Sequence, residues 1–491
     1  MGEAMKEELL RQVLKEAPVL AECIAKDGQS SLRSYCEKMV SINRAKEDAL
    51  ECYPTEAVGE AVKKYLLVLV GEELAELTGE QVKKQRLILT ANHHGAEFFA
   101  QSVQGNILYS YILERMGYPH IVPVFANTTV NMSNENFPRG LLVYHTNSGL
   151  LKLPVFPFKE RNTLVAAADG FTREMAERTL AETVRCQKNG SLAEETAAVI
   201  QNILRKCYLD ELILGEEKYA RQVLHINRRL FQKMYQDEKK ELLYIEMEAI
   251  SSQLFQWDLA NKSNPLLKNL LFKEEMTETL IMELNQKTGC WESGTQRGTF
   301  LFWGVDERKR RFSLSLRKEG ARSYLWGMDM EKQEYRYAYD EESILDALDK
   351  KLLVPGLFLT FFELYLTRDF VPAGGCFQSV YLREMCRGLI RVLEKEKGYD
   401  RELHMLRRKE SVYLSGPVFL TAGAEAAYPM GTVEIIEHGG LTMKELPALL
   451  ELSVIRAHEI GLFHFYPDLI PATRRKENWW QKLSEEIGDI V

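Results

Sequence analysis

The sequence of 491 residues contains no apolar run long enough to cross a bilayer. Its longest apolar stretches, such as residues 65–70 and 352–362, are far shorter than the roughly 20 residues that a membrane-spanning helix needs. The first part of the chain carries acids and bases every few positions and lacks the apolar segment of a signal peptide. We therefore expect a cytoplasmic protein that does not enter membranes.

Paired cysteine motifs and an excess of positive charge are also missing. The eight cysteines are scattered, without a C-x-x-C pair or the spacing of a zinc ribbon, which indicates reduced and mostly structural thiols. Sixty-three basic against 71 acidic residues give a net charge of −8, which repels a phosphate backbone unless a local patch overrides it. We expect a small-molecule partner and neither nucleic acid nor a membrane. The sequence predicts no particular oligomeric state.

Three common ligand motifs are absent. The chain has no G-x-G-x-x-G, no G-x-x-x-x-G-K-[ST] and no H-E-x-x-H. These absences exclude the usual dinucleotide fingerprint, the P-loop and the zinc-protease helix. A nucleotide or a metal bound in another way stays open, so the sequence leaves the cofactor unknown.

What the sequence does contain is the alternation of helical and strand patterns that is typical of an α/β protein. Apolar residues at helical spacing predict a helical cap over residues 1–84. A short apolar run at 86–90, a helical pattern from about 98 to 116 and a buried run at 120–125 predict a βαβ unit with parallel strands. We expect residues 85–255 to form the first part of a Rossmann-like, mostly parallel core.

The rest of the chain is expected to complete this core around an insertion. Two more runs, at 141–144 and 153–158, have the pattern of strands. Short alternating runs between 297 and 339 predict antiparallel hairpins, so residues 256–350 are interpreted as a helix plus a β-hairpin-rich insertion. Residues 351–491 would then supply the second part of the core and the C-terminal helices.

The best candidate for a site is the turn after the first predicted strand, Asn92-His93-His94-Gly95. In open α/β sheets, ligands bind beyond the carboxyl ends of strands, and the next helix can present N–H groups to an anion. Because a histidine titrates near neutral pH, His93 or His94 is the candidate acid or base. Alternatively, one histidine caps the helix and the other packs in the core.

A metal offers a second interpretation of the same turn. His93 and Glu97 are four residues apart and would share a helical face if the helix has begun by then. With His145 they would make a three-ligand set for a metal-dependent hydrolase. Without the metal, Glu97 is a candidate substrate-binding residue.

Amide side chains cluster around the turn. Some lie in the otherwise apolar helical stretch that follows it, and others lie in the loop after the second strand. Buried amides need partners, either in the neighbouring backbone or in a polar ligand. The candidates for binding a substrate are Gln101, Gln104, Asn106, Asn127 and Asn131. In the same loop Arg139 could grip a carboxylate or phosphate with two N–H groups.

A glycine turn at Pro372-Ala-Gly-Gly-Cys-Phe-Gln-Ser-Val-Tyr-Leu-Arg383 opens another predicted helix. Gly374 and Gly375 would let a ligand approach the backbone closely, with Gln378 and Tyr381 facing inward. A plain helix N-terminus is the alternative.

Two stretches of the chain share the layout of a known family. The first predicted strand runs into residues 92–95, and the next helix carries Gly105-Asn-Ile-Leu-Tyr109. Later, Asn264-Pro-Leu-Leu-Lys268 and Leu353-Val-Pro-Gly-Leu357 lead to Ala373-Gly-Gly375 with Gln378 and Tyr381. This layout resembles the cysteine-adding enzymes of bacillithiol biosynthesis, which have Gly-Gln-Gln-Ala-Gly, Gly-Pro-Leu-Tyr, Leu-Ile-Pro-Thr-Leu and Ala-Gly-Pro-Gly-Glu-(x)2-Tyr in these places.

The resemblance spans about residues 86–145 and 264–385 and departs from the family pattern at two points. His93-His94 stand where the family has paired glutamines, and residues 128–131 replace an acidic loop that contains a histidine. The resemblance implies a Rossmann-like core and a ligase-like condensation between an amine and a carboxylate.

Three hypotheses about function follow. The first is an enzyme that binds a small polar substrate bearing a carboxylate or phosphate and joins it to an amine. The second is the metal-dependent hydrolase of His93, Glu97 and His145. The third is a non-catalytic protein of the same fold that binds a small ligand.

Overall fold

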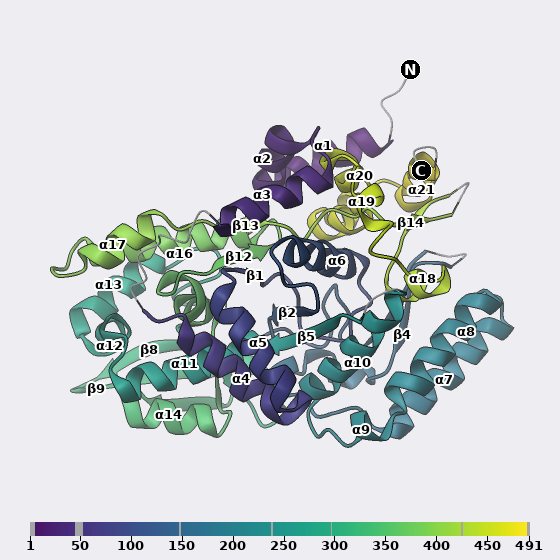
Figure 1. The fold of residues 1–491 in the computed structure, drawn as a ribbon. Helices are drawn as coiled ribbons and strands as arrows, with labels where there is room; N and C mark the ends of the chain where they lie inside the picture. Colours follow the sequence, from purple (N-terminus) through teal and green to yellow (C-terminus); the bar gives the residue numbers. More distant parts are fainter. Residues whose placement is uncertain are drawn as a thin grey trace.

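The structure, a computed structural model, describes residues 5–44, 53–146, 149–236, 239–295, 297–423 and 426–488. Its centre is a five-stranded parallel sheet with the strand order β13-β12-β1-β2-β5 (Figure 1). The strands are β1 (Leu87–Leu89), β2 (Ile121–Ala126), β5 (Glu241–Glu246), β12 (Val371–Gly374) and β13 (Val412–Tyr413). A parallel sheet flanked by helices confirms the predicted Rossmann-like α/β core.

Side chains of the strands alternate between two hydrophobic cores, one on each face of the sheet. Leu87 and Leu89 belong to one core and Ile88 to the other, and Tyr244 and Ile245 divide in the same way. The first core is covered by α6 (Ala100–Arg115), α10 (Tyr219–Met234) and α20 (Val454–Leu469). The second is covered by α4 (Glu56–Val70), α11 (Met247–Asn261) and α16 (Gln378–Leu393). Apolar residues on both faces explain why the strands read as continuous apolar runs.

The helices of the N-terminal region pack on both sides of the molecule. In Figure 1 the purple helices α1 (Met5–Glu16), α2 (Pro18–Asp27) and α3 (Leu32–Arg44) lie beside the yellow C-terminal helices, and α1 contacts α20 and α21 (Trp479–Gly488). The backbone N–H groups of Met5 and Lys6 donate to the Glu486 carboxylate over 2.7 and 2.8 Å. By contrast, α4 packs against α5 (Glu72–Lys84) on the opposite side of the sheet.

The predicted β insertion is present as two small antiparallel sheets, with orders β10-β9-β8 and β11-β6-β7. Its strands are β6 (Phe302–Val305), β7 (Arg311–Phe312), β8 (Leu314–Glu319), β9 (Arg322–Met328), β10 (Glu334–Ala338) and β11 (Leu353–Pro355). The helices around it are α12 (Pro265–Phe272), α13 (Glu274–Leu284), α14 (Glu341–Asp349) and α15 (Leu357–Phe361). The prediction of antiparallel hairpins between residues 297 and 339 is therefore confirmed.

The two further strands predicted at about 141–144 and 153–158 are present as short strands. The runs at 141–144 and 153–158 do not extend the main sheet, because β3 (Gly140–Val143) and β4 (Leu151–Pro154) pair only with each other as an antiparallel hairpin. The stretch predicted as a glycine turn that opens a helix instead contains the strand β12, which lies next to β1 in the sheet, and Pro372 and Gly374 weaken its strand pattern. The remaining elements are α7 (Arg173–Lys188), α8 (Glu194–Ile203), α9 (Glu211–Leu214), α17 (Asp400–Arg407), α18 (Thr432–Glu437), α19 (Leu446–Leu449), β14 (Thr421–Ala422) and β15 (Tyr428–Pro429).

Two expectations about composition can be compared with the described residues. None of the helices found there is both long and apolar enough to pass through a membrane. The seven cysteines in this part of the chain are free thiols, and Cys52 lies outside the described residues.

Candidate functional site

The carboxyl ends of the central strands open into a cavity of about 840 Å³, which we call the sheet-edge cavity. The chain runs from β1 through β2 to β5 and then returns to place β12 on the other side of β1. Such a reversal leaves a crevice between the two strand ends, where open α/β sheets bind ligands. Thr90, which follows β1, and Gly375, which follows β12, both line the cavity. Five of the predicted residues line it: His93, Asn127, Gly375, Gln378 and Tyr381.

Gln378 is held at the crevice by the strand beside it. Its Nε2 donates to Thr90 Oγ1 over 2.8 Å, and the Thr90 backbone N–H donates to the Ala373 carbonyl over 2.9 Å. A Cβ atom at Gly374 would lie 2.2 Å from the Gln378 side chain. Gly374 therefore acts by making room for Gln378 where α16 begins.

The chain continues in extended form after β1, which sets His93 beside Asn127. The His94 N–H donates to the Asn127 carbonyl and the Asn127 N–H donates to the Asn92 carbonyl, both over 2.8 Å. The helix does not begin until Ala100. This start lies close to the predicted one at about residue 98, but neither histidine caps the helix, because their segment makes strand-like pairs with the end of β2.

The hydrogen bonds around His93 select one tautomer. His93 is half-buried, and its Nδ1 lies 3.4 Å from Asn134 Oδ1. That oxygen also accepts from the Asn136 N–H over 2.9 Å, while Asn134 Nδ2 donates to the Asn131 carbonyl over 2.8 Å, so the amide is oriented. Nδ1 must then carry the proton, which leaves the lone pair on Nε2. Burial lowers the pKa of His93, so the ring is neutral at neutral pH and can accept a proton.

Glu248 holds the loop after β2 against the cavity. Its carboxylate accepts from the N–H and the hydroxyl of Thr128, each over 2.7 Å, and from the Thr129 hydroxyl over 3.1 Å. Asn127 Oδ1 also lies 3.1 Å from Thr129 Oγ1. The Nδ2 protons are therefore the donors that Asn127 offers to a ligand.

Sequence reasoning missed the basic side chains that line the cavity. Lys287, Arg297 and Arg311 line it together with one acid, Glu292. Arg311 donates to the Thr129 carbonyl, and its guanidinium lies 4.3 Å from the centroid of the Trp303 ring. Arg311 lies on a two-residue strand and Lys287 between elements, so nothing in their sequence surroundings distinguished them from surface residues.

Three of the predicted residues instead form a buried group around Tyr244, which we call the Tyr244 cluster. The Tyr244 hydroxyl donates to Glu97 Oε2 and accepts from Asn92 Nδ2 over 2.6 Å and from Asn106 Nδ2 over 3.1 Å. Burial raises the pKa of Glu97 to about 8. Asn92, Glu97 and Asn106 do not line the sheet-edge cavity, because their buried side chains hydrogen-bond to Tyr244 in the interior.

His94 belongs to the same interior region. Its side chain is fully buried and meets the Tyr244 ring edge-on at 5.8 Å. Neither ring nitrogen has a hydrogen-bond partner among the described residues, and burial lowers the pKa of His94 to about 3. His94 therefore does not reach the cavity in which His93 lies.

The two glutamines of α6 are also outside the cavity. Gln104 is fully buried, and its amide bonds the backbone of residues 419, 420 and 430 over 2.7–2.9 Å. Gln101 is half-buried in the first turn of α6. Gln104 therefore has a structural role, because it joins α6 to a C-terminal loop.

The remaining predictions fall on packing positions away from the cavity. Arg139 lies over the rings of Phe137 and Phe158, at 5.2 and 5.6 Å, and does not serve as the anion grip of this site. Asn131 pairs with Leu164 in an isolated bridge. A Cβ atom at Gly95 would lie 2.9 Å from Pro138, so this glycine allows close packing.

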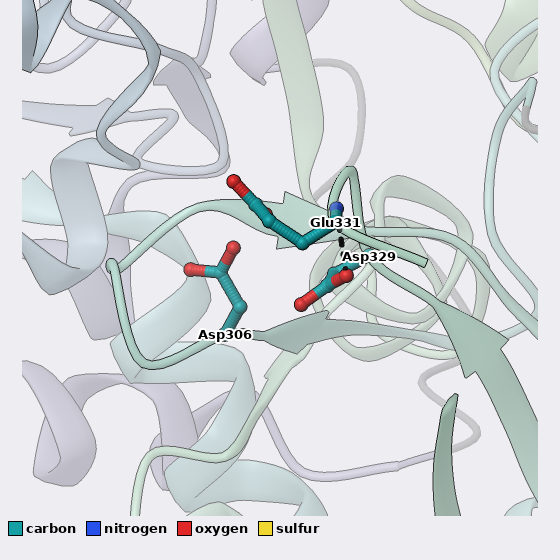
Figure 2. Close-up of side chains that lie close together, drawn as sticks. All are labelled: Asp306, Asp329 and Glu331. Carbon is teal, nitrogen blue, oxygen red and sulfur yellow. Dashed lines mark hydrogen bonds between the residues drawn. The ribbon is translucent and has the colours of Figure 1, made fainter. Parts of the chain in front are cut away.

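The proposed metal set of His93, Glu97 and His145 is not assembled, because each residue faces different partners. His145 Nδ1 lies 3.2 Å from the Glu437 carboxylate, and its ring stacks on Tyr428 at 5.0 Å. Among the described residues the three-ligand group that does occur is Asp306, Asp329 and Glu331, shown in Figure 2.

This acidic group has structural partners of its own. Arg310 bonds both Asp306 and Glu331. Asp329 accepts from the Glu331 N–H over 2.9 Å, the dashed line in Figure 2, and from the Gln333 N–H over 2.9 Å. Asp329 therefore closes the turn between β9 and β10, and Asp306 bonds Arg310 within the turn between β6 and β7.

The sheet-edge cavity combines a neutral proton acceptor, His93, with amide donors and basic side chains. No family model, no curated protein and no solved structure matches the chain. The chemistry of these side chains is therefore the basis for a functional proposal.

Proposed function

We propose that this protein is an enzyme that binds a small substrate bearing a carboxylate or phosphate in the sheet-edge cavity. The observation that carries the proposal is the charge of the lining: Lys287, Arg297 and Arg311 stand against Glu292 alone, in a chain whose net charge is −8. Guanidinium groups match the planar or tetrahedral oxygens of such anions. The volume of about 840 Å³ is in the range of small-molecule sites.

His93 is the proposed general base. It is the titratable side chain of the histidine turn that lines the cavity, and its Nε2 carries the lone pair. A base must be unprotonated before the reaction, and the lowered pKa of His93 keeps it so at neutral pH. Asn127 and Gln378 would orient the substrate through their amides.

The resemblance to the cysteine-adding enzymes extends the proposal to a ligase-like condensation. In such a reaction an amine nitrogen attacks the carbonyl carbon of an activated carboxylate, such as an acyl phosphate. The C–N bond forms, the activating group leaves with its bonding electrons, and the nitrogen loses a proton. His93 Nε2 would take this proton, and Arg311 and Lys287 would neutralise the anion.

The test of this proposal is a matched pair of arginine variants. Arg311 and Arg317 both lie over a tryptophan, at 4.3 and 3.2 Å from Trp303 and Trp326, but Arg317 does not line the cavity. Titration with succinate and with pyrophosphate is followed by tryptophan fluorescence, because Trp291 and Trp303 line the cavity. Arg311→Gln should weaken binding by about tenfold or more, since a hydrogen bond to a charged group is lost.

Arg317→Gln should bind both anions as the unmodified protein does. Equal affinity of Arg311→Gln and Arg317→Gln, or no fluorescence change with either anion, would overturn the proposal. A Trp303→Phe variant identifies the signal, because it should lose most of the change without losing the fold.

A further inference from the structure

A second cavity, of about 590 Å³, lies on the other side of α16, and we call it the basic groove. Its walls come from α2, α16 and the segment that leads into β13. It shares no lining residue with the sheet-edge cavity. Positions 379, 383, 386, 387 and 390 of α16 line the groove, while positions 378 and 381 line the sheet-edge cavity. These spacings place the two sets on different faces of one helix.

The groove is strongly basic although the chain as a whole is acidic. It is lined by two acids, Glu22 and Glu410, and by five basic residues: Lys26, Arg383, Arg387, Arg407 and Lys409. A local excess of positive charge on a chain of net charge −8 needs a reason, because these cations repel one another.

The ion pairs within the protein compensate this charge only in part: Arg407 pairs with Glu394 over 2.8 Å, and the Lys409 ammonium lies 3.9 Å from Asp369. Arg383 lies 3.8 Å from Glu22, and both side chains are more than half exposed, so this pair is weak. Within the described parts of the chain, Lys26 and Arg387 have no acidic partner within 4.0 Å. Arg383 and Arg387 lie one turn apart on α16, where two like charges destabilise a helix unless an anion lies between them.

The floor of the groove is largely uncharged. Cys23, Cys386 and Tyr365 are buried there, and burial raises the pKa of Cys386 to about 11, so it stays a neutral thiol. Lys409 is the exception: its side chain is 1% exposed, and its ammonium donates to the Arg368 carbonyl. The groove thus combines a fixed buried cation, exposed arginines and an apolar base.

We infer that the basic groove binds a small phosphorylated molecule, with its phosphate or diphosphate between Arg383 and Arg387. Several cations that line one open groove match a multiply charged anion, and arginine forks match phosphate oxygens. A volume of about 590 Å³ accommodates a small molecule. The apolar floor offers a surface for the uncharged part of such a ligand.

Arginine footprinting of the unmodified protein tests this site directly. Phenylglyoxal modifies exposed arginines, and mass spectrometry reports the rate at each position. Millimolar pyrophosphate at physiological salt should slow the modification of Arg383 and Arg387 several-fold and leave Arg391 unchanged. Arg391 lies on the same helix but pairs with Glu283 outside the groove, so it is the matched control. If pyrophosphate leaves the modification rates of Arg383 and Arg387 unchanged, as it should that of Arg391, the inference is overturned.

Calorimetry of variants gives a second, independent measurement. The Arg311→Gln variant is used as the background because it should bind anions weakly in the sheet-edge cavity. The heat released on adding pyrophosphate then reports mainly on binding in the basic groove. The further changes Arg383→Gln and Arg387→Gln together should weaken pyrophosphate binding by about tenfold or more, while Arg391→Gln should not. If the doubly changed groove binds as tightly as the Arg391→Gln control, the site is not there. Failure here leaves the fluorescence result for the sheet-edge cavity unaffected, so the two proposals fail separately.

Discussion

The sheet-edge cavity and the Tyr244 cluster are two polar regions built from the same turn, and they differ in what their side chains bind. His93 lines the cavity, whereas its neighbours Asn92 and His94 are buried beside Tyr244. In an extended chain, successive side chains point to opposite sides. Two adjacent histidines in such a segment therefore cannot both line one cavity, and the conformation of the segment decides which of them does.

The two regions also differ in how far their polar atoms are satisfied. In the Tyr244 cluster, one hydroxyl joins two amides and a carboxyl inside the protein, and Asn92 Oδ1 is the atom left without a partner among the described residues. In the cavity, His93 and Asn127 belong to the lining, and their side-chain hydrogen bonds within the described residues involve Nδ1 of His93 and Oδ1 of Asn127, not His93 Nε2 or Asn127 Nδ2. Buried polar groups that satisfy each other build structure, and those left open to a cavity bind ligands.

The largest expected effect separates the two histidines. Because glutamine cannot titrate near neutrality, His93→Gln should lower turnover of the substrate by about 100-fold, in keeping with the loss of a general base. The turnover of the unmodified enzyme should also fall in acid, once the pH drops below the lowered pKa of His93.

The control is His94→Leu, which removes two unpaired buried nitrogens at similar volume. It should keep turnover and change the free energy of unfolding by less than about 1.5 kcal/mol. A loss of turnover in His94→Leu as severe as that in His93→Gln would contradict the assignment of only His93 to the cavity.

An intermediate effect is expected from Tyr244→Phe, which deletes the hydroxyl at the centre of the Tyr244 cluster and keeps the ring. Glu97 and Asn92 would each lose a buried partner. The free energy of unfolding should fall by about 1–3 kcal/mol, measured by urea denaturation. Succinate affinity of the folded protein should not change, and a large loss of affinity with intact stability would place Tyr244 in the binding site instead.

The smallest effect, when expressed per pH unit, concerns the pH dependence of stability. Burial raises the pKa of Glu97 from its ordinary 4.5 to about 8, so the folded state favours the protonated acid. This contribution is fully present below pH 4.5 and is lost as the pH rises through 8. Glu97→Gln should therefore make stability fall less steeply between pH 5 and 8, by at most about 1.4 kcal/mol per pH unit.

Urea titrations at several pH values measure this slope. Glu246 and Glu363, whose pKa values burial raises to about 7 and about 8, act in the same direction. Some slope should therefore remain in the Glu97→Gln variant. An unchanged slope would mean that Glu97 does not hold its proton in the folded protein.

The sequence predicted the fold correctly in the segments where the apolar patterns were long. The βαβ unit of β1, α6 and β2 and the antiparallel insertion follow directly from such patterns. The strands β12 and β13 did not stand out, since one holds a proline and a glycine and the other has two residues. Their place in the sheet comes from contacts between distant segments, which local periodicity does not record.

The sequence predicted residues of the candidate site correctly only where they lie near the ends of strands. His93, Asn127 and Gln378 follow or flank strands, and this position brought them to the cavity. Gln104 and Arg139 were plausible binding residues by residue type. In the structure, Gln104 hydrogen-bonds to the backbone of a C-terminal loop, and Arg139 packs on two phenylalanine rings. Arg311 comes from an insertion far along the chain, so only the folded arrangement places it at the site.

Helix α16 contributes lining residues to both cavities. If a ligand in the basic groove shifts or stiffens α16, it also changes the surroundings of Gln378 and Tyr381 on the opposite face. The affinity of each cavity then depends on the occupancy of the other, and the coupling free energy is the same in both directions. A phosphorylated metabolite could thereby tune how tightly the substrate is held without touching it.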